Sequence, residues 1–431
     1  MSCGQLVGVA VLIAGFVGSL WGVEKPNIVF IMADDLGYGD LGCFGSEHLK
    51  TPHVDALAKG GVKCSDFHSN GAVCSPTRAA LMTGRYQQRS GITGVVTAAN
   101  HRETGLALKE RTLAELLKRY DYRTGLFGKW HLGYPAKYNP VHHGFDEYTG
   151  FVSGNVDYHR KIDQEGFADW WHQDQPAIEE GYVTDLISDK GVAFIRKNFE
   201  KPFCLILTHG APHYPLQGRE TPGFRVVGKS QPRQKAVDRK RIHAEMIEVM
   251  DEGIGKLVAT LDELKIRRNT LVIFCSDNGP AGDGSSGGLR GRKGQIYEGG
   301  HRVPAIFNWP GTLEPSVNGQ IMMTMDLFPT FLAMAGGEPG EAFDGLDILP
   351  LLKGGIQKRE PVFWGIKSQT AVREGSWKLI LSPKNKVELF NLDQDLAEKK
   401  DVSDSEPEVT NRLRNLAESW RAEMEKIPKK S

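Results

Sequence analysis

The sequence predicts an α/β protein, because short apolar runs alternate with amphipathic helical patterns along most of the chain. Three runs have the length and the continuous apolar character of buried strands, namely 27–32, 203–207 and 271–275. A further strand-like run covers 124–127. An all-α or an all-β protein would not alternate the two patterns in this way.

Helices are expected between these strands, and two of them have recognisable starts. Pro52 follows Thr51 and takes the first helical position, where its missing N–H breaks no hydrogen bond. Thr112 and Glu115 form a capping-box pattern ahead of two leucines. Residues 241–264 carry apolar side chains at near-helical spacing, which predicts a long helix with one face in the core.

The pattern changes near residue 360. Four short strand-like runs follow, at 362–364, 371–373, 377–380 and 387–390. A charged helical stretch begins near Glu406. We therefore expect a small C-terminal α+β subdomain with antiparallel strands. The predicted organisation is a leading segment at 1–23, a main domain at 24–360 and this subdomain at 361–431.

Overall charge excludes some partners. The 431 residues include 53 Lys and Arg and 53 Asp and Glu, so the formal net charge is zero. No long-range field favours a nucleic acid or a membrane surface, and neither is expected as a stable partner. An anionic substrate must be bound by local positive charge.

The first 23 residues contain no charged side chain, and 6–16 form an apolar stretch. This composition predicts a secretory signal, and hence a secreted or periplasmic protein. The alternative is an uncleaved anchor, since about 20 apolar residues can span a bilayer. Six cysteines are present. Cys43 and Cys64 are candidates for a disulfide, which the sequence does not decide.

Polar side chains follow each of the three buried strands. Asp34 and Asp35 come after the first, residues 209–213 after the second, and Asp277 and Asn278 after the third. Ligands of open α/β sheets bind beyond the carboxyl ends of the strands, so these groups are expected on one rim. Carboxylate and amide oxygens suit Ca²⁺ or Mg²⁺, although an isolated Asp-Asp pair is more often solvated.

Residues 74–78 read Cys-Ser-Pro-Thr-Arg, and Pro76 with the following Ala-Ala-Leu-Met predicts a helix N-terminus. This pentapeptide resembles the signature of type I sulfatases, in which the cysteine is oxidised to the aldehyde formylglycine. Residues 33–40 and 276–279 resemble the metal-binding stretches of that family. The resemblance implies an alkaline-phosphatase-like α/β/α sandwich with a central mixed sheet. It also implies one divalent cation, usually calcium, held by Asp34, Asp35, Asp277, Asn278 and the formylglycine formed from Cys74.

Lys129 and His131 lie two residues apart, so on an extended segment both side chains would face one pocket. The string Lys-Trp-His-Leu-Gly is similar to the family, which implies that Lys129 contacts sulfate and His131 hydrogen-bonds the nucleophile. In the same way, Lys293 is implied as a second sulfate ligand. Arg78 lies one helical turn after Cys74 and is expected to stabilise an oxyanion at position 74.

Residues 212–215 read Pro-His-Tyr-Pro and match a family pattern, which makes His213 the candidate general acid. His209 is a candidate substrate contact or a support for the loop, and Ser153 is a candidate sulfate contact.

Residues 155–178 are the part least similar to the family. Their aromatic side chains predict a carbohydrate pocket, because aromatic faces stack on sugar rings. The residues concerned are Tyr158, His159, Trp170 and Trp171. The alternative is that the paired tryptophans only anchor a long loop.

The predicted function is hydrolysis of a sulfate ester of a saccharide, in the manner of bacterial arylsulfatases and N-acetylgalactosamine-6-sulfatase-like proteins. The resemblance further implies a formylglycine-generating maturation enzyme as a partner. Two alternatives stay open. One is a phosphate or phosphonate monoester hydrolase of the same superfamily, and the other is a non-catalytic protein that binds sulfated glycans because Cys74 is never oxidised.

Overall fold

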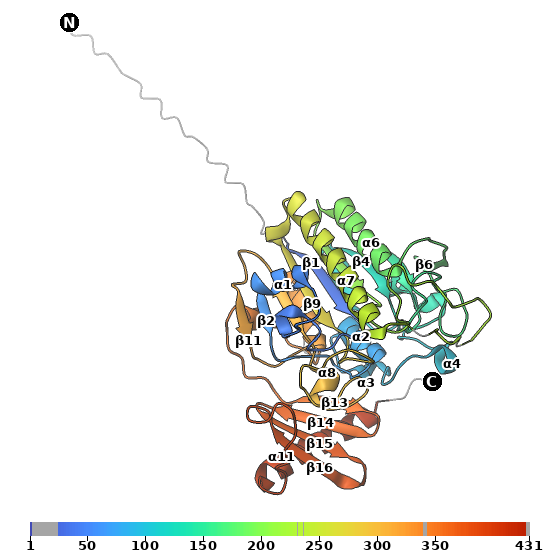
Figure 1. Cartoon of the computed structure of the whole chain (residues 1–431). Helices are drawn as coiled ribbons and strands as arrows, with labels where there is room; N and C mark the ends of the chain where they lie inside the picture. The colour runs from blue at the N-terminus through green and yellow to red at the C-terminus, as the bar shows by residue number, and fades with distance from the viewer. Residues whose placement is uncertain (2–24, 231, 236, 339–342, 428–431) are drawn as a thin grey trace.

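The computed structural model describes residues 1, 25–230, 232–235, 237–338 and 343–427 (Figure 1). Apart from Met1, the expected signal or anchor at 1–23 lies outside the described residues. Within the described ranges, no helix has both the length and the apolar composition needed to cross a membrane. Cys43 and Cys64 are both free thiols, so the candidate disulfide is not formed.

A ten-stranded mixed sheet forms the centre of the protein, in the order β11-β2-β10-β9-β1-β8-β4-β5-β6-β7. Its middle is parallel: β1 (Asn27–Ala33) lies between β9 (Thr270–Ser276) and β8 (Phe203–Thr208). Next to β8 lie β4 (Arg123–Lys129) and β5 (Glu147–Phe151), also parallel. The remaining strands are β2 (Val62–Cys64), β6 (Trp171–His172), β7 (Gln175–Pro176), β10 (Ala305–Asn308) and β11 (Ser316–Asn318).

Helices cover both faces of this sheet, so that β1 is buried on both sides. Val29 and Ile31 pack with α1 (Pro52–Lys59), α6 (Val183–Asn198) and α7 (Arg239–Glu263). Ile28, Phe30 and Met32 join the opposite cluster with α2 (Cys74–Thr83), α5 (Leu113–Lys118) and α9 (Leu327–Met334). The α/β/α arrangement and the predicted strands are thereby confirmed.

Short elements complete the main domain. A two-stranded sheet pairs β3 (Phe67–His68) with β12 (Met322–Met323). The short helices are α3 (Gln87–Ser90), α4 (Ala98–His101), α8 (Glu298–His301) and α10 (Leu349–Leu352). The 3-10 turns of this part are Gly42–Phe44, Ala136–Tyr138, Pro140–His143, Arg267–Asn269 and Thr324–Asp326, and a further one, Pro383–Asn385, connects two strands of the C-terminal region.

The C-terminal region forms a separate antiparallel sheet below the main one (Figure 1). Its strands are β13 (Val362–Ile366), β14 (Gln369–Glu374), β15 (Trp377–Ser382) and β16 (Lys386–Asn391). Helix α11 (Pro407–Glu425) packs Leu413 and Ala417 against Val372 and Leu379 of this sheet. The four predicted strands and the charged helix are confirmed.

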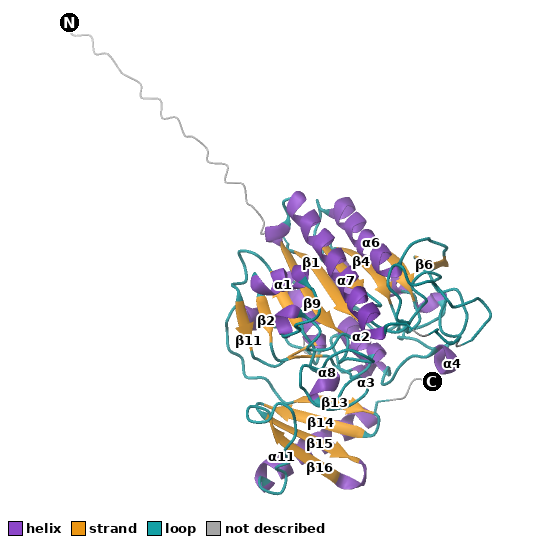
Figure 2. Cartoon of the chain, in the orientation of Figure 1, coloured by secondary structure: helices purple, strands orange, loops and turns teal. Residues whose placement is uncertain are grey.

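The carboxyl ends of β1, β8, β9 and β4 meet at one edge of the main sheet, where loops gather between the strands and α2 (Figure 2). Backbone hydrogen bonds hold these loops together. Asp34 N–H donates to the Ala211 carbonyl at 3.0 Å, and Asp277 N–H donates to the Ala33 carbonyl at 3.1 Å. The convergence expected for the polar groups after the strands is therefore observed.

Candidate active site

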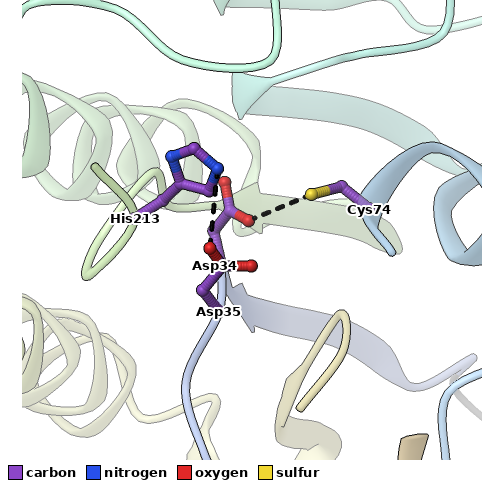
Figure 3. A group of neighbouring side chains, drawn as sticks. All are labelled: Asp34, Asp35, Cys74 and His213. Carbon is purple, nitrogen blue, oxygen red and sulfur yellow. Dashed lines mark hydrogen bonds and ion pairs between the residues drawn. The ribbon is translucent and has the colours of Figure 1, made fainter. Parts of the chain in front are cut away.

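Cys74 is the first residue of α2, and all ten residues of this helix are buried. Its Sγ lies 3.4 Å from Asp34 Oδ1 (Figure 3). The helix ends at Gly84, whose φ of 65° lies in the left-handed region that glycine adopts without strain. Burial, and then the charge of Asp34, raises the pKa of the Cys74 thiol to about 12. Unmodified, the side chain is therefore a neutral thiol at physiological pH and not a nucleophilic thiolate.

Three carboxylates and one amide lie beside Cys74, because their strands are neighbours in the sheet. Asp34 and Asp35 follow β1, while Asp277 and Asn278 follow β9. Asn278 Nδ2 donates to Asp35 Oδ1 at 2.8 Å, and Asp35 N–H donates to Asp277 Oδ1 at 3.3 Å. The four residues implied as metal ligands are thus brought together.

The carboxyl groups of this cluster differ in their proton affinity. Burial, and then the charge of Asp34, raises the pKa of Asp277 to about 6. For Asp35 burial also favours the protonated form, but the charges of His213 and Lys293 outweigh it and lower its pKa to about 2. Asp277 is therefore the carboxylate best suited to accept a proton near neutral pH.

The cluster fits a divalent cation. Asn278 Oδ1 is buried and accepts no hydrogen bond in the described part of the chain. A ligand atom from each of Asp34, Asp35, Cys74 and His213 lies within 4.8 Å of the others. Oxygen donors of this kind suit Ca²⁺ or Mg²⁺, and a cation would satisfy the buried amide oxygen.

Two lysines add positive charge at the same place. Lys129 Nζ lies 2.5 Å from Asp34 Oδ2, and Lys293 Nζ lies 2.6 Å from Asp35 Oδ1. Lys129 is fully buried at the end of β4, whereas Lys293 lines the cavity that opens at Cys74. Both implied sulfate-binding lysines are therefore part of the cluster.

Arg78 pairs with Asp277 of the cluster. Its Nε and Nη2 donate to Asp277 Oδ2 at 3.2 and 2.8 Å, and Nη1 donates to the Lys129 carbonyl at 2.8 Å. The guanidinium thus pairs with a buried carboxylate that needs a cation, and Cys74 is among the groups whose charge acts on it. In this arrangement Arg78 orients Asp277.

His131 lies in the cavity, but not for the reason that its spacing suggested. Strand β4 ends at Lys129, and His131 has a φ of 58°, so the two side chains do not alternate on one extended segment. His131 Nε2 lies 3.0 Å from the Val96 carbonyl, which makes Nε2 the protonated nitrogen. Nδ1 is buried without a partner and is free to accept a proton. Burial, and then the charge of Lys129, holds the pKa of His131 well below its usual range.

His213 faces the cluster from the loop after β8. Its Nδ1 donates to the Tyr214 carbonyl at 2.6 Å, and its Nε2 lies 3.5 Å from Asp35 Oδ2 (Figure 3). Burial, and then the charge of Lys293, lowers the pKa of His213 to about 3. The ring is therefore neutral until a negative charge offsets that of Lys293.

Ser153 and His209 are placed differently. Ser153 lines the cavity, where its Oγ donates to the Asn155 carbonyl at 3.0 Å. His209 is fully buried, and neither ring nitrogen has a hydrogen-bond partner within the described ranges. The substrate contact expected of His209 is therefore not available, and the alternative role as a support for the loop fits its burial.

The aromatic residues predicted to line a sugar pocket do not line the cavity at Cys74. Tyr158 and Trp170 are each 2% exposed, which leaves no free ring face for a sugar. Tyr158 OH donates to the His213 carbonyl at 3.1 Å, and Trp170 Nε1 donates to Glu179. His159 Nε2 lies 3.0 Å from the Gly218 carbonyl in the loop between β8 and α7, and Trp171 Nε1 donates to Asp169 at 2.8 Å. The alternative interpretation, an anchored long loop, is the one that the structure supports.

The cavity itself has a volume of about 260 Å³ and opens beside Cys74, His131, His213 and Lys293. It is also lined by Asn100, Asn155, Asp163, Gln164 and Glu165. Asn100 belongs to the short helix α4, and the other four lie in 155–178, the stretch predicted to form a carbohydrate pocket, although that prediction rested on its aromatic residues and not on these polar ones. Amide and carboxylate groups of this kind are suited to hydrogen-bond hydroxyl groups.

A second group of candidate metal ligands, His68, Glu298 and His301, is fully buried between the main domain and the C-terminal sheet. The Lys378 ammonium occupies the place a cation would take. Its Nζ lies 2.9 Å from Glu298 Oε1 and 3.1 Å from His301 Nε2. This group is therefore a buried ion-pair network and not a second metal centre.

Comparison with known families places two matches along the chain. A family model described as Sulfatase matches residues 26–337. A second, described as N-sulphoglucosamine sulphohydrolase, C-terminal, matches residues 292–426. Together they cover both the main sheet and the C-terminal sheet.

Individual proteins are similar over most of their length. Human arylsulfatase A is 33% identical over 412 residues, which cover 85% of this chain and 77% of that protein. N-acetylgalactosamine-6-sulfatase of Canis lupus familiaris is 33% identical over 382 residues, covering 82% and 71%. The crystal structure of Ps i-CgsB in complex with k-i-k-neocarrahexaose superposes with a TM-score of 0.83 at 33% identity, covering 92% of this chain and 93% of that one.

Proposed function

Because the chain belongs to the sulfatase family of hydrolases, we propose that it releases inorganic sulfate from a sulfated carbohydrate through a formylglycine formed from Cys74. The observation that carries the proposal is the position of Cys74, at the end of a cavity and beside Asp34, His213 and Lys293. The sugar bound to Ps i-CgsB supports a carbohydrate substrate.

An aldehyde at position 74 explains how this residue can act as a nucleophile. The thiol is held neutral, since its pKa is raised to about 12 by burial and by Asp34. Hydration of formylglycine gives two hydroxyl groups on one carbon. One can attack sulfur, and the other remains to expel the product, which a serine in place of Cys74 could not do.

Asp34, Asp35, Asp277 and Asn278 would hold a divalent cation, Ca²⁺ or alternatively Mg²⁺, which when bound neutralises negative charge on the sulfate oxygens and the nucleophile. Lys129 and Lys293 supply fixed positive charge on the same side. A sulfate ester would otherwise be repelled by the three carboxylates.

In the first half of the proposed reaction, one hydroxyl of the hydrate attacks sulfur and gives its proton to Asp277. The bond between sulfur and the sugar oxygen breaks, and His213 protonates that oxygen as it leaves. A sulfate ester now links the former hydroxyl to position 74.

In the second half, the remaining hydroxyl loses its proton, for which the unpartnered Nδ1 of His131 is available. Its oxygen forms the carbonyl bond while the bond to sulfate breaks, so sulfate leaves and the aldehyde is restored. Addition of water regenerates the hydrate. The net reaction consumes one water and yields one alcohol and one sulfate.

The proposal also includes a maturation partner and a location. Formylglycine requires a maturation enzyme that acts on Cys74, and the uncharged start of the chain supports a secreted or periplasmic protein.

The test measures the mass of the peptide that contains position 74 and the release of sulfate on the same preparation. The peptide that contains position 74 is expected to be about 18 Da lighter than its cysteine form, as oxidation to the aldehyde requires for this nucleophile. Cys74→Ala is expected to abolish sulfate release from an aryl sulfate, while Cys204→Ala, which alters another buried free thiol, keeps it. Sulfate release by Cys74→Ala would contradict the proposal.

The same assays separate the alternatives. Faster hydrolysis of an aryl phosphate than of the aryl sulfate would favour a phosphate or phosphonate hydrolase. Binding of sulfated glycans by a protein with unmodified Cys74 and no turnover would favour a non-catalytic role.

A further inference from the structure

A second cavity, of about 500 Å³, adjoins the first on the outer side of the loop between β8 and α7. We call it the basic groove and define it by Gln164, Tyr214, Arg225, Arg233, Lys235 and Arg239. Four of these six residues are cationic. No aspartate or glutamate lines it among the described residues.

The basic groove neighbours the cavity at Cys74. Gln164 lines both of them, and Tyr214 directly follows His213, which faces Cys74. Arg225 Nη1 donates to the Asn155 carbonyl at 3.2 Å, and Asn155 lines the cavity on the other side of this wall. A chain molecule with one unit at Cys74 would reach the groove by passing Gln164, the residue that the two cavities share.

Arg225 is the most informative residue of the groove. It is 1% exposed, and it donates to the carbonyls of Asn155 and Ile162 and to the amide oxygen of Asn155. No carboxylate forms an ion pair with it in the described part of the chain. Burial lowers the pKa of Arg225, and the charges of Tyr214, Asp157 and Asp163 offset this effect only in part.

Arg78 and Arg373, which are also buried, do have such a partner: Arg78 pairs with Asp277 at 2.8 Å and Arg373 with Asp66 at 2.7 Å. Arg267 is buried without a carboxylate partner in the described part of the chain, and it donates instead to the Thr270 carbonyl and to Asn308. A buried charge normally needs a counter-ion, so a cationic wall without one is suited to receive an anion from outside.

The exposed cationic side chains of the groove also favour an anionic ligand. Arg239 pairs with Asp283, but within the described ranges no carboxylate pairs with Arg233 or Lys235. The chain as a whole carries no net charge, so this local excess is not a consequence of composition. Clustered cations of one sign attract anions and orient them before contact.

We propose that the basic groove binds a second anionic group, a sulfate or a carboxylate, of the same glycan whose reacting sulfate lies at Cys74. This inference rests on the proposed function. It narrows the substrate class to polyanionic oligosaccharides, because a monosaccharide with a single sulfate cannot occupy both cavities.

The test uses the mature full-length protein and two probes of equal length, a multiply sulfated carrageenan tetrasaccharide and its desulfated form. The groove variant is Arg233→Glu/Lys235→Glu. The matched control is Lys399→Glu/Lys400→Glu, which makes the same change in net charge on exposed residues of the C-terminal region. Binding is measured by calorimetry at low and high salt, and hydrolysis of an aryl sulfate reports on the catalytic cavity.

Wild-type protein is expected to bind the sulfated probe more tightly than the desulfated one. The groove variant is expected to lose about tenfold in affinity at low salt, equivalent to about 1.4 kcal/mol, and less at high salt. The control variant keeps wild-type affinity. Both variants keep the aryl sulfate turnover of the wild type, because neither pair of residues touches Cys74.

Three results would overturn the inference: equal binding of the two probes by the wild type, unchanged affinity in the groove variant, or an equal loss in groove and control variants. A parallel loss of aryl sulfate turnover in the groove variant would also overturn it, since the residues would then belong to the catalytic cavity. If no form hydrolyses the aryl sulfate but only the groove variant loses binding, the groove is supported and the proposed hydrolysis fails.

Discussion

His213 carries one proton on Nδ1, which its contact with the Tyr214 carbonyl fixes, and offers Nε2 toward the carboxylate of Asp35. A proton donated to a leaving group must therefore come from Nε2. Burial and the charge of Lys293 lower the pKa of His213 to about 3, and a bound sulfate ester would offset the charge of Lys293. We therefore expect His213 to gain its proton only when substrate is present.

His213→Gln is expected to reduce hydrolysis of an alkyl or sugar sulfate by about 10²–10⁴-fold, the range typical of a lost general acid. Hydrolysis of an aryl sulfate with an acidic phenol should fall much less, because that leaving group departs without a proton. His159→Gln, which alters a histidine outside the cavity, serves as the control. Equal losses on both substrates would argue against a role for His213 in protonation.

The candidate site was predictable where a residue follows a strand or lies in a short motif. Asp34, Asp277 and Lys293 are of this kind, and the structure brings them together. Asn155 and Gln164 were not predictable, because a loop brings them to the cavity without periodicity. Trp170 misled the prediction, since an aromatic side chain packs in a core as readily as it binds a sugar.

At the scale of elements, the loop that carries Lys293 is fixed by the C-terminal sheet. Arg290 Nη1 donates to the Glu398 carbonyl at 2.7 Å, and Tyr297 OH donates to Glu388 at 3.0 Å. Glu298 ends the loop, and Lys378 of β15 bridges it to Glu398 at 2.9 and 2.8 Å. The position of Lys293 at Asp35 therefore depends on a sheet that contributes no residue to the cavity.

Lys378→Met should leave the carboxylates of Glu298 and Glu398 buried without their shared cation, which costs about 3–5 kcal/mol of unfolding free energy. We also expect KM for the aryl sulfate to rise more than kcat falls, because Lys293 loses its fixed position. Thermal unfolding and steady-state kinetics measure the two effects. Lys399→Met, at an exposed position nearby, should change neither. A loss of stability with unchanged KM would separate this network from the catalytic loop.

A helix or strand was predictable where its own residues show a clear apolar run, a periodic pattern or a cap. The central strands β1, β8 and β9 are buried on both faces and therefore read as continuous apolar runs. Helix α6 was missed because its first residue, Val183, follows Tyr182, which provides no side-chain cap. Strands β6 and β7 have two residues each, too few for any period to be visible.

For the whole molecule, the charges at the site balance before any ligand binds. Asp34, Asp35 and Asp277 face Lys129, Lys293 and Arg78, so a divalent cation would add a net positive charge that suits a sulfate ester. Binding of the cation requires Asp277 to be ionised. Protons and the cation therefore compete for the same carboxylate.

The pKa of Asp277, raised by burial and by Asp34 from 3.8 to about 6, fixes the sign of this effect. In the metal-free protein its contribution to stability is complete below pH 4 and is lost as the pH rises through 6. A cation reverses that loss, so Ca²⁺ should raise the unfolding temperature by more degrees at pH 7.5 than at pH 5.

Differential scanning calorimetry with Ca²⁺ and with a chelator at each pH measures this difference. The comparison of the two samples at one pH also removes the contribution of the buried histidines to stability, because their lowered pKa values affect both samples alike. Asp277→Asn should reduce the dependence on pH, and Mg²⁺ in place of Ca²⁺ identifies the preferred ion. An equal shift at both pH values would show that Asp277 takes no part in binding.

The burial of Cys74 also fixes an order of events during synthesis. Every residue of α2 is enclosed by the two sheets and their helices, so no modifying enzyme can reach the thiol once the chain has folded. The proposed oxidation of Cys74 would therefore have to precede folding on each newly made chain. The fraction of molecules that carry formylglycine would then be fixed during synthesis and could not increase after folding. Preparations from different expression hosts should therefore differ in specific activity although their proteins share one fold.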